Sequence, residues 1–206
     1  MKTLKIAVLL SGSGTTMQNL IDKIREGTLN AQIVLAIADR TNTRGLERAT
    51  VAGIPTKLVL REDCATLAEF SEKIFGQCRQ FQADLVVMGG FLRLIQVPQD
   101  FENKVINIHP SLIPAFCGKG FHGLNVHRAV IEAGNKITGC TIHFADNIYD
   151  HGPIIMQCPV KVLDDDTPET LMKRVFEEEC RAYPEAIRLF GEGKLQIDGR
   201  RVRILS

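Results

Sequence analysis

The stretch Val105-Ile106-Asn107-Ile108-His109-Pro110-Ser111-Leu112-Ile113-Pro114 organises the rest of this chain. It begins as an apolar run typical of a buried strand, and its prolines end that strand because each lacks the N–H that a sheet ladder needs. Asn107 and His109 stand two residues apart, so on a strand both side chains leave the same face. Open α/β sheets bind ligands at the carboxyl ends of their strands. We therefore interpret Asn107 and His109 as a catalytic pair. The alternative is a packed histidine at a turn beside an asparagine that bonds backbone.

Before this stretch, short apolar runs alternate with amphipathic segments. The expected strands are 4–10, 33–38, 56–60 and 84–88, and the expected helices follow residue 16 and span 46–52 and 67–81. This alternation predicts an α/β fold, with a doubly wound, mostly parallel Rossmann-like sheet and helices on both faces.

After it, the pattern predicts a helix at 126–133, strands at 138–145 and 154–160, a long last helix and a C-terminal hairpin of 194–197 and 201–205. In strand 138–145 the apolar residues alternate with polar ones, which places His143 on the polar face of a half-buried strand. Thr167 suits the N-cap of the last helix and Pro168 its first position. The acidic run 164–166 complements the helix dipole, and we interpret it as capping, not as a cation site.

Composition limits the class of protein. The chain has 206 residues, 45% of them hydrophobic, which fits a single domain spanning 1–206. The chain has 25 Lys and Arg against 24 Asp and Glu, a formal net charge of +1. It therefore lacks the excess of positive charge that is typical of nucleic-acid binding proteins. No run is long enough for a membrane span or a signal peptide, which favours a cytoplasmic protein. The six cysteines contain no C-x-x-C pair and are interpreted as reduced thiols.

The loop Ser11-Gly12-Ser13-Gly14-Thr15-Thr16 joins the first strand to a helix. Free N–H groups and the helix dipole make such a place a natural phosphate site, although a plain tight turn explains the loop equally well. A dinucleotide motif would need a third glycine, although Asp39 is placed to act as a ribose-binding acid. A Walker loop is not supported, because Gly118-Lys119 is followed by Gly120.

Five motifs occur in order along nearly the whole chain: Ser11-Gly12-Ser13-Gly14-Thr15-Thr16, Gly90-Phe91-Leu92-Arg93-Leu94, Asn107-Ile108-His109-Pro110-Ser111-Leu112, His143-Phe144 and Asp150-His151-Gly152-Pro153. Together they resemble the phosphoribosylglycinamide formyltransferases of the folate-dependent formyltransferase superfamily. The resemblance implies transfer of a formyl group from the co-substrate 10-formyltetrahydrofolate, without a metal, to the amino group of glycinamide ribonucleotide in purine synthesis.

The resemblance also implies roles for individual residues. The catalytic residues would be Asn107, His109 and Asp150. Glycinamide ribonucleotide would be bound by Gly14, Thr15 and Thr16 at its phosphate and by Glu179 at its ribose. The folate would contact Leu92, Arg93, Leu94, Ile95 and Asn107. The family commonly has an arginine near residue 65 that contacts the folate, whereas this chain offers only Arg61 before that point. The loop 117–122 is also longer than in some relatives.

Formyl transfer to an amine explains why such a trio is needed. Attack of the amine produces an oxyanion and a cationic nitrogen, so Asn107 and a protonated His109 would supply donors, and Asp150 would favour the charged imidazole. A 10-formyltetrahydrofolate hydrolase would use the same trio, but we expect such an enzyme to carry a further domain before the first strand. A phosphate-ligand binding module without activity and a nicotinamide-dependent oxidoreductase are the alternatives of other classes.

Overall fold

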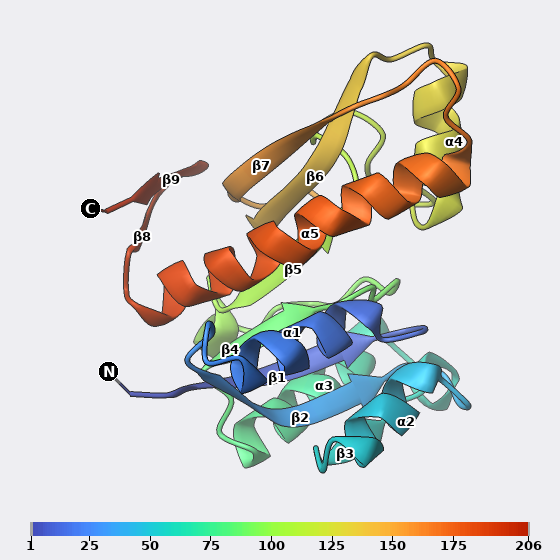
Figure 1. Ribbon diagram of the computed structural model, residues 1–206. Coiled ribbons are helices and arrows are strands. Elements are labelled where there is room, and N and C mark those ends of the chain that lie inside the picture. The colour runs from blue at the N-terminus through green and yellow to red at the C-terminus, as the bar shows by residue number, and fades with distance from the viewer. Residues whose placement is uncertain (1, 206) are drawn as a thin grey trace. The chain divides into compact units, whose positions relative to one another are not determined.

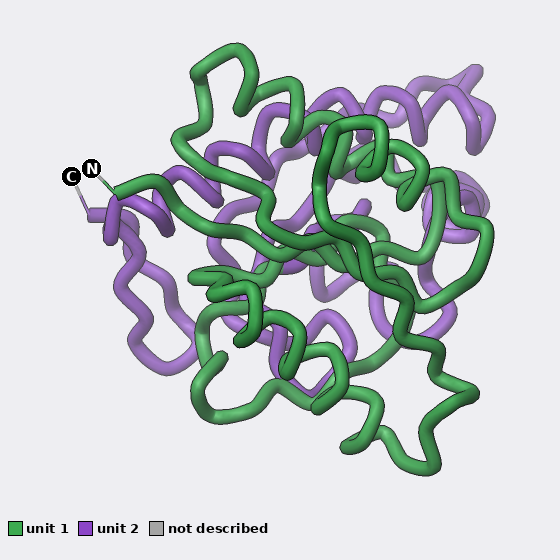
Figure 2. The backbone as a smooth tube through the Cα atoms, turned by 90° about the horizontal axis from the view of Figure 1, so that it is seen from below, with its two compact units in different colours: residues 1–106 green, residues 107–206 purple. Residues whose placement is uncertain are grey.

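A computed structural model describes residues 2–205 of the chain (Figure 1). The residues cluster into two compact units, Met1–Ile106 and Asn107–Ser206, which are coloured separately in Figure 2 and are described one at a time. Strand β5, Val105–His109, crosses the boundary between them. The expectation that residues 1–206 form a single domain stays a prediction.

The first unit is a parallel sheet with helices between its strands. Its strands are β1 (Leu4–Leu10), β2 (Ala31–Ala38), β3 (Thr56–Leu58) and β4 (Leu85–Met88), in the order β3-β2-β1-β4. Its helices are α1 (Thr15–Arg25), α2 (Arg44–Val51) and α3 (Leu67–Gln80), with 3-10 turns η1 (Arg61–Asp63) and η2 (Gln99–Phe101). The order reverses between β1 and β4, so right-handed crossovers place α1 and α2 on one face and α3 on the other (Figure 1).

The predicted elements of this unit are confirmed, with shifted ends. Strands β1 and β4 are buried almost throughout, as their continuous apolar sequences indicate. Strand β3 ends at Leu58 instead of residue 60. Helix α2 begins at Arg44, two residues earlier than expected, because its N-cap is the extended Thr43.

The second unit contains α4 (Leu124–Glu132), β6 (Ile137–Phe144), β7 (Ile154–Lys161), α5 (Pro168–Gly191), β8 (Leu195–Asp198) and β9 (Arg201–Ile204). The strand order is β6-β7-β9-β8, with antiparallel β6/β7 and β8/β9 pairs and a parallel contact between Ile154 and Arg201. The C-terminal hairpin is therefore confirmed. The α/β fold class is confirmed as well, because the β1/β2, β1/β4 and β2/β3 pairs are parallel and helices connect these strands.

Helix α5 begins as the sequence predicts. The Thr167 hydroxyl accepts a hydrogen bond from the Thr170 amide, the Thr170 hydroxyl accepts one from the Thr167 amide, and Pro168 is the first helical residue. Asp166 accepts hydrogen bonds from the Leu163 amide and the Thr170 hydroxyl and pairs with Arg174. The acidic run therefore includes a capping residue, as interpreted from the sequence.

The prediction that His143 lies on the polar face of a half-buried strand is wrong, because the strand is buried on both faces. His143 is only 1% exposed, and of the residues in β6 only Ile137 is exposed. Helix α5 packs against β6, and the polar side chains of the strand find internal partners. The Thr141 hydroxyl, for example, donates to the Ser111 carbonyl at 2.7 Å and accepts from the Ile113 amide at 3.0 Å. Internal hydrogen bonds allow polar residues to occupy a buried strand.

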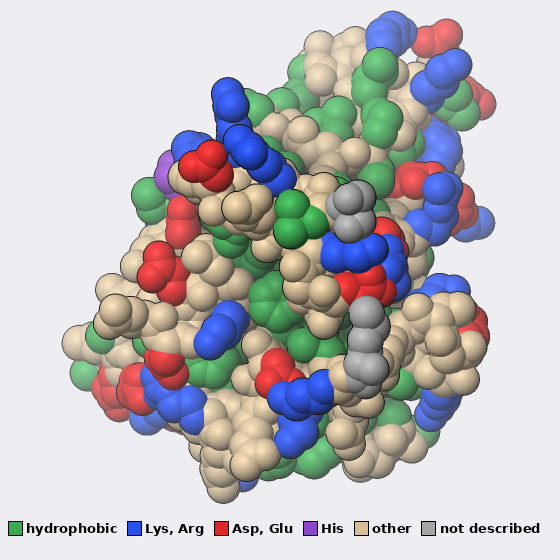
Figure 3. Space-filling view, turned by 90° about the vertical axis from the view of Figure 1, so that its left-hand side faces the viewer, with side chains coloured by type: hydrophobic (Ala, Val, Ile, Leu, Met, Phe, Trp, Pro, Cys, Tyr) green, Lys and Arg blue, Asp and Glu red, His purple; other side chains and the backbone are tan. Residues whose placement is uncertain are grey.

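Cationic and anionic side chains are interspersed on the face drawn in Figure 3. Among residues 2–205, no helix is both long and apolar enough to cross a membrane.

Candidate active site

The carboxylate of Asp150 joins three segments of the second unit. Its Oδ1 accepts from Asn107 Nδ2 at 3.3 Å, and its Oδ2 accepts from the Gly118 amide at 2.8 Å. His109 Nδ1 lies 3.5 Å from the same Oδ2. The side chains of His109 and Asp150 are 5% and 10% exposed. The structure therefore brings together all three residues that the sequence marks as catalytic, together with the loop after β5.

His109 has a defined tautomer in this arrangement. Its Nε2 lies 2.9 Å from the Phe116 carbonyl oxygen, which only accepts, so Nε2 carries a proton and Nδ1 faces Asp150. Burial lowers the pKa of His109, and the charge of Asp150 opposes this shift without cancelling it. The imidazole is therefore mostly neutral at neutral pH. The protonated His109 expected from the sequence does not describe the resting site.

Asn107 is held between two acceptors. Its Nδ2 lies 3.2 Å from His143 Nε2 as well as 3.3 Å from Asp150 Oδ1. His143 Nδ1 donates to the Phe144 carbonyl at 2.8 Å, which leaves Nε2 as the acceptor. The opposite orientation of the amide would place its oxygen against the carboxylate, so this orientation is the favourable one. His143 is thus a residue of the site. The alternation of apolar and polar residues in its strand did not predict this position, although His143 belongs to one of the motifs noted in the sequence.

Asp150 is ionised at neutral pH. Burial alone raises its pKa, but the neighbouring His143 and His109 rings and the hydrogen bond from the Gly118 amide together outweigh burial and lower it. The backbone of Asp150 is left-handed, with φ 52°. This conformation costs a non-glycine residue about 1 kcal/mol or more, so surrounding contacts must hold it.

The glycine two residues after Asp150 is required by a close approach. A Cβ on Gly152 would lie 1.9 Å from the Phe144 carbonyl oxygen. On the other side of the glycine, the Phe144 amide donates to the Pro153 carbonyl at 2.9 Å. The segment that leaves Asp150 is therefore pressed directly against the end of β6.

The proposed phosphate loop lies in the first unit, at the start of α1. Gly14 is the N-cap, in a left-handed conformation with φ 69°, and no side chain caps the helix. The first backbone bond of α1 runs from the Gln18 amide to the Gly14 carbonyl, so the amides of Thr15, Thr16 and Met17 have no acceptor within the helix. The loop therefore has the donors that an anion requires.

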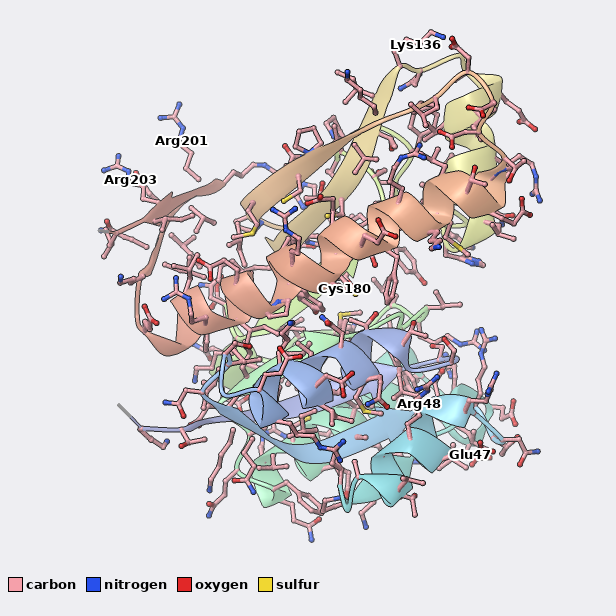
Figure 4. The ribbon with its side chains drawn as sticks, viewed as in Figure 1. Glu47, Arg48, Lys136, Cys180, Arg201 and Arg203 are labelled. Carbon is pink, nitrogen blue, oxygen red and sulfur yellow. The ribbon has the colours of Figure 1, made fainter. Side chains whose placement is uncertain are left out.

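Two features around this loop were not evident from the sequence. A Cβ on Gly14 would lie 2.6 Å from the Cα of Gly45, so α1 and α2 approach each other through two glycines. Arg48 of α2 donates from Nε to the Ser13 carbonyl at 3.1 Å and from Nη1 to Gln18, which places a cation beside the loop (Figure 4). An arginine on a helix surface gives no sequence signal for such a role.

The segment 92–95, expected to contact the folate, is anchored in the first unit. The Leu92 amide donates to the Ser11 hydroxyl at 2.9 Å. Arg93 Nε donates to Asp39 Oδ2 at 3.0 Å, and the Asp39 side chain is fully buried. Ile95 is 2% exposed and belongs to the core, whereas Arg93 is exposed and Leu92 and Leu94 are partly exposed.

Glu179 and Arg61 complete the residues singled out by the sequence. Glu179 lies on α5, close to Cys140. The pKa of the Cys140 thiol is raised mainly by burial and further by the charge of Glu179. Although Glu179 retains some surface, burial raises its own pKa to about 8. Arg61 donates to the Cys64 carbonyl at 2.6 Å, so its guanidinium is engaged locally. Within residues 2–205, no group of three or more His, Cys, Asp or Glu side chains is arranged to hold a metal ion.

Comparison with known proteins defines the class. Residues 4–187 match the family model described as formyl transferase. A phosphoribosylglycinamide formyltransferase of Haemophilus influenzae is 35% identical over 195 residues, which cover 94% of this chain and 90% of that protein. The crystal structure of glycinamide ribonucleotide transformylase 1 from Symbiobacterium toebii matches with a TM-score of 0.92 and 43% identity, over 99% of this chain and 95% of that one. This chain belongs to the phosphoribosylglycinamide formyltransferase family.

Some relatives are much longer. The trifunctional purine biosynthetic protein adenosine-3 of Gallus gallus is 40% identical over 195 residues, which are 94% of this chain but only 19% of that protein. The chain thus spans about a fifth of the length of such relatives.

Proposed function

We propose that this protein transfers the formyl group of 10-formyltetrahydrofolate to the amino group of glycinamide ribonucleotide, in purine synthesis. The observation that carries the proposal is the cluster of Asn107, His109 and Asp150 at the end of β5, in a chain of this family. The cluster needs no metal and no nucleophilic side chain for acyl transfer to an amine.

Each group of the cluster has a step to perform. The amine nitrogen attacks the formyl carbon, the carbonyl oxygen becomes an oxyanion, and the bond to the folate nitrogen then breaks as that nitrogen takes a proton. The lone pair on His109 Nδ1 and the ionised Asp150 are acceptors for the proton that leaves the amine. Once His109 is charged, Asp150 stabilises it at a separation of 3.5 Å. Asn107 is the amide donor for the oxyanion.

The remaining roles are assigned to residues whose local structure suits them. Gly14, Thr15 and Thr16 bind the ribonucleotide phosphate, supported by the uncapped start of α1 and by the Arg48 guanidinium at the loop. Glu179 accepts the ribose hydroxyls. Leu92, Arg93 and Leu94 contact the folate, with Ile95 as their support in the core.

A direct test mixes the purified protein with glycinamide ribonucleotide and 10-formyltetrahydrofolate and follows release of tetrahydrofolate. We expect release that depends on the ribonucleotide and yields a formylated product. Release without the ribonucleotide identifies a hydrolase instead. Binding of a phosphorylated ligand without any release identifies a non-catalytic binding module.

A further inference from the structure

The C-terminal hairpin contacts the loop that carries Asp150. Arg200 occupies the turn between β8 and β9, and its Nη2 donates to the His151 carbonyl oxygen at 2.8 Å. Its Nη1 lies 2.8 Å from His151 Nε2. One guanidinium therefore holds both the backbone and the ring of the residue that follows Asp150.

Asp146 completes this arrangement from the opposite end of the loop. Because arginine only donates, His151 Nε2 accepts from Arg200, and the ring proton lies on Nδ1, 2.7 Å from Asp146 Oδ2. The other oxygen of Asp146 accepts from the Ile148 amide at 2.8 Å. The contacts Asp146–His151–Arg200 thus close the base of the loop, and we call these three residues the loop clamp.

The loop needs such restraint. Asp150 has a left-handed backbone, which an isolated loop populates poorly. Asn147 and Ile148 at the tip are exposed, so little apolar packing fixes the segment. Directly after the clamp, the approach of Gly152 to Phe144 fixes the other end. The polar contacts of the clamp therefore restrain the loop immediately next to Asp150.

We propose that Arg200 is a positioning residue, which acts through His151 to hold Asp150 against Asn107 and His109. The C-terminal hairpin then helps to position a catalytic carboxylate, although it does not contact the reacting atoms. The kinetic consequence rests on the function proposed above, whereas the structural consequence does not.

The test compares Arg200→Ala with Arg203→Ala. Arg203 lies on the same hairpin, points away from the protein body in Figure 4 and pairs with Asp198 at 3.6 Å, so it is a matched control. Arg200→Ala should lower kcat by about fivefold with both KM values unchanged, since exposed polar contacts are individually weak and this change removes several. Arg200→Lys, which retains one cation but not the fork, should recover part of the loss.

Two measurements need no substrate. The Gly118 amide donates to Asp150 Oδ2, so its hydrogen exchange should be faster in Arg200→Ala and unchanged in Arg203→Ala. The NMR titration of His109 should shift to a lower pKa in Arg200→Ala, because the carboxylate that favours the charged ring is held less well. Faster exchange of the β6 amides as well would indicate general loosening and would contradict the proposal.

The variant His151→Leu breaks the clamp from the loop side and leaves the hairpin sequence intact. It should reproduce the faster Gly118 exchange and the lower His109 pKa. If both variants leave these two signals as in the wild type, Arg200 does not position Asp150. If the wild-type protein transfers no formyl group, the proposed function fails, and the exchange and titration data still decide on the clamp.

Discussion

Replacing Gly152 by alanine tests how closely the segment after Asp150 is pressed against β6. The added Cβ would lie 1.9 Å from the Phe144 carbonyl oxygen and 2.9 Å from the carbonyl carbon. A close carbon–oxygen contact in proteins is about 3.3 Å, so the two backbones must separate by roughly 1.4 Å. No side-chain rotation can relieve this clash, because both colliding groups belong to the backbone.

The expected cost follows from what the separation breaks. It removes the 2.9 Å bond from the Phe144 amide to the Pro153 carbonyl, and Phe144 is 1% exposed. A buried amide without an acceptor costs about 1–3 kcal/mol, and overpacking costs about 1–3 kcal/mol more. We expect the free energy of unfolding to fall by about 2–6 kcal/mol. The kcat should fall as well, because Asp150 lies two residues before the clash.

Urea denaturation of the variant and the wild type measures this loss. Gly76→Ala is the matched control, because it makes the same chemical change in α3, where an added Cβ meets no atom within 4 Å. Alanine is the better helix former by about 0.5–1 kcal/mol, so the control should gain stability. A Gly152→Ala protein within about 1 kcal/mol of the wild type would refute the close approach.

Three further changes test the site. His109→Ala should lower kcat by about a hundredfold to a thousandfold while both substrates still bind, as steady-state kinetics and a binding titration can establish. Asp150→Asn keeps the shape but removes the charge that opposes the effect of burial, so the pKa of His109 should fall further in an NMR titration, and an equal pKa in the two proteins would exclude this influence of Asp150. The pKa of Glu179 is about 8 in the folded protein, against an ordinary value of 4.5. Between these two values the folded protein keeps a proton on Glu179 that the unfolded chain releases. The free energy of unfolding of the wild type should therefore fall as the pH rises from about 5 to 8. Glu179→Gln should show a smaller fall in urea unfolding at these two pH values, and equal slopes would contradict the raised pKa.

The sequence predicts those features that depend on local patterns. Strand β5 ends at His109 as expected, because Pro110 cannot continue a ladder. The N-cap at Thr167 and the hairpin around Gly199 are likewise encoded by a few adjacent residues. The trio could be assigned because its members lie in motifs of recognisable spacing.

Features that depend on distant residues could not be predicted. His143 is buried because α5 packs on its strand and because Asn107, on another strand, binds its ring. Gly14 reads as a glycine that lets an anion approach, yet it also packs against Gly45, which no local pattern reveals. A valine at Gly14 would therefore disturb the packing of α1 and α2 as well as the loop. Substitution of the exposed Thr15 is the cleaner test of phosphate binding.

In the resting cluster around Asp150, the side-chain N–H groups of Asn107, His109 and His143 already donate to acceptors within the protein. The Asn107 amide faces His143 and Asp150, the His109 Nε2–H faces the Phe116 carbonyl, and the His143 Nδ1–H faces the Phe144 carbonyl. The lone pairs on Asn107 Oδ1 and His109 Nδ1 are used by none of these contacts. These free acceptors can accept hydrogen bonds from the N–H groups of a substrate amine. The resting site offers no free side-chain donor of this cluster to an oxyanion. In the reaction proposed above, Asn107 therefore exchanges one of these two partners for the substrate oxygen as the oxyanion forms.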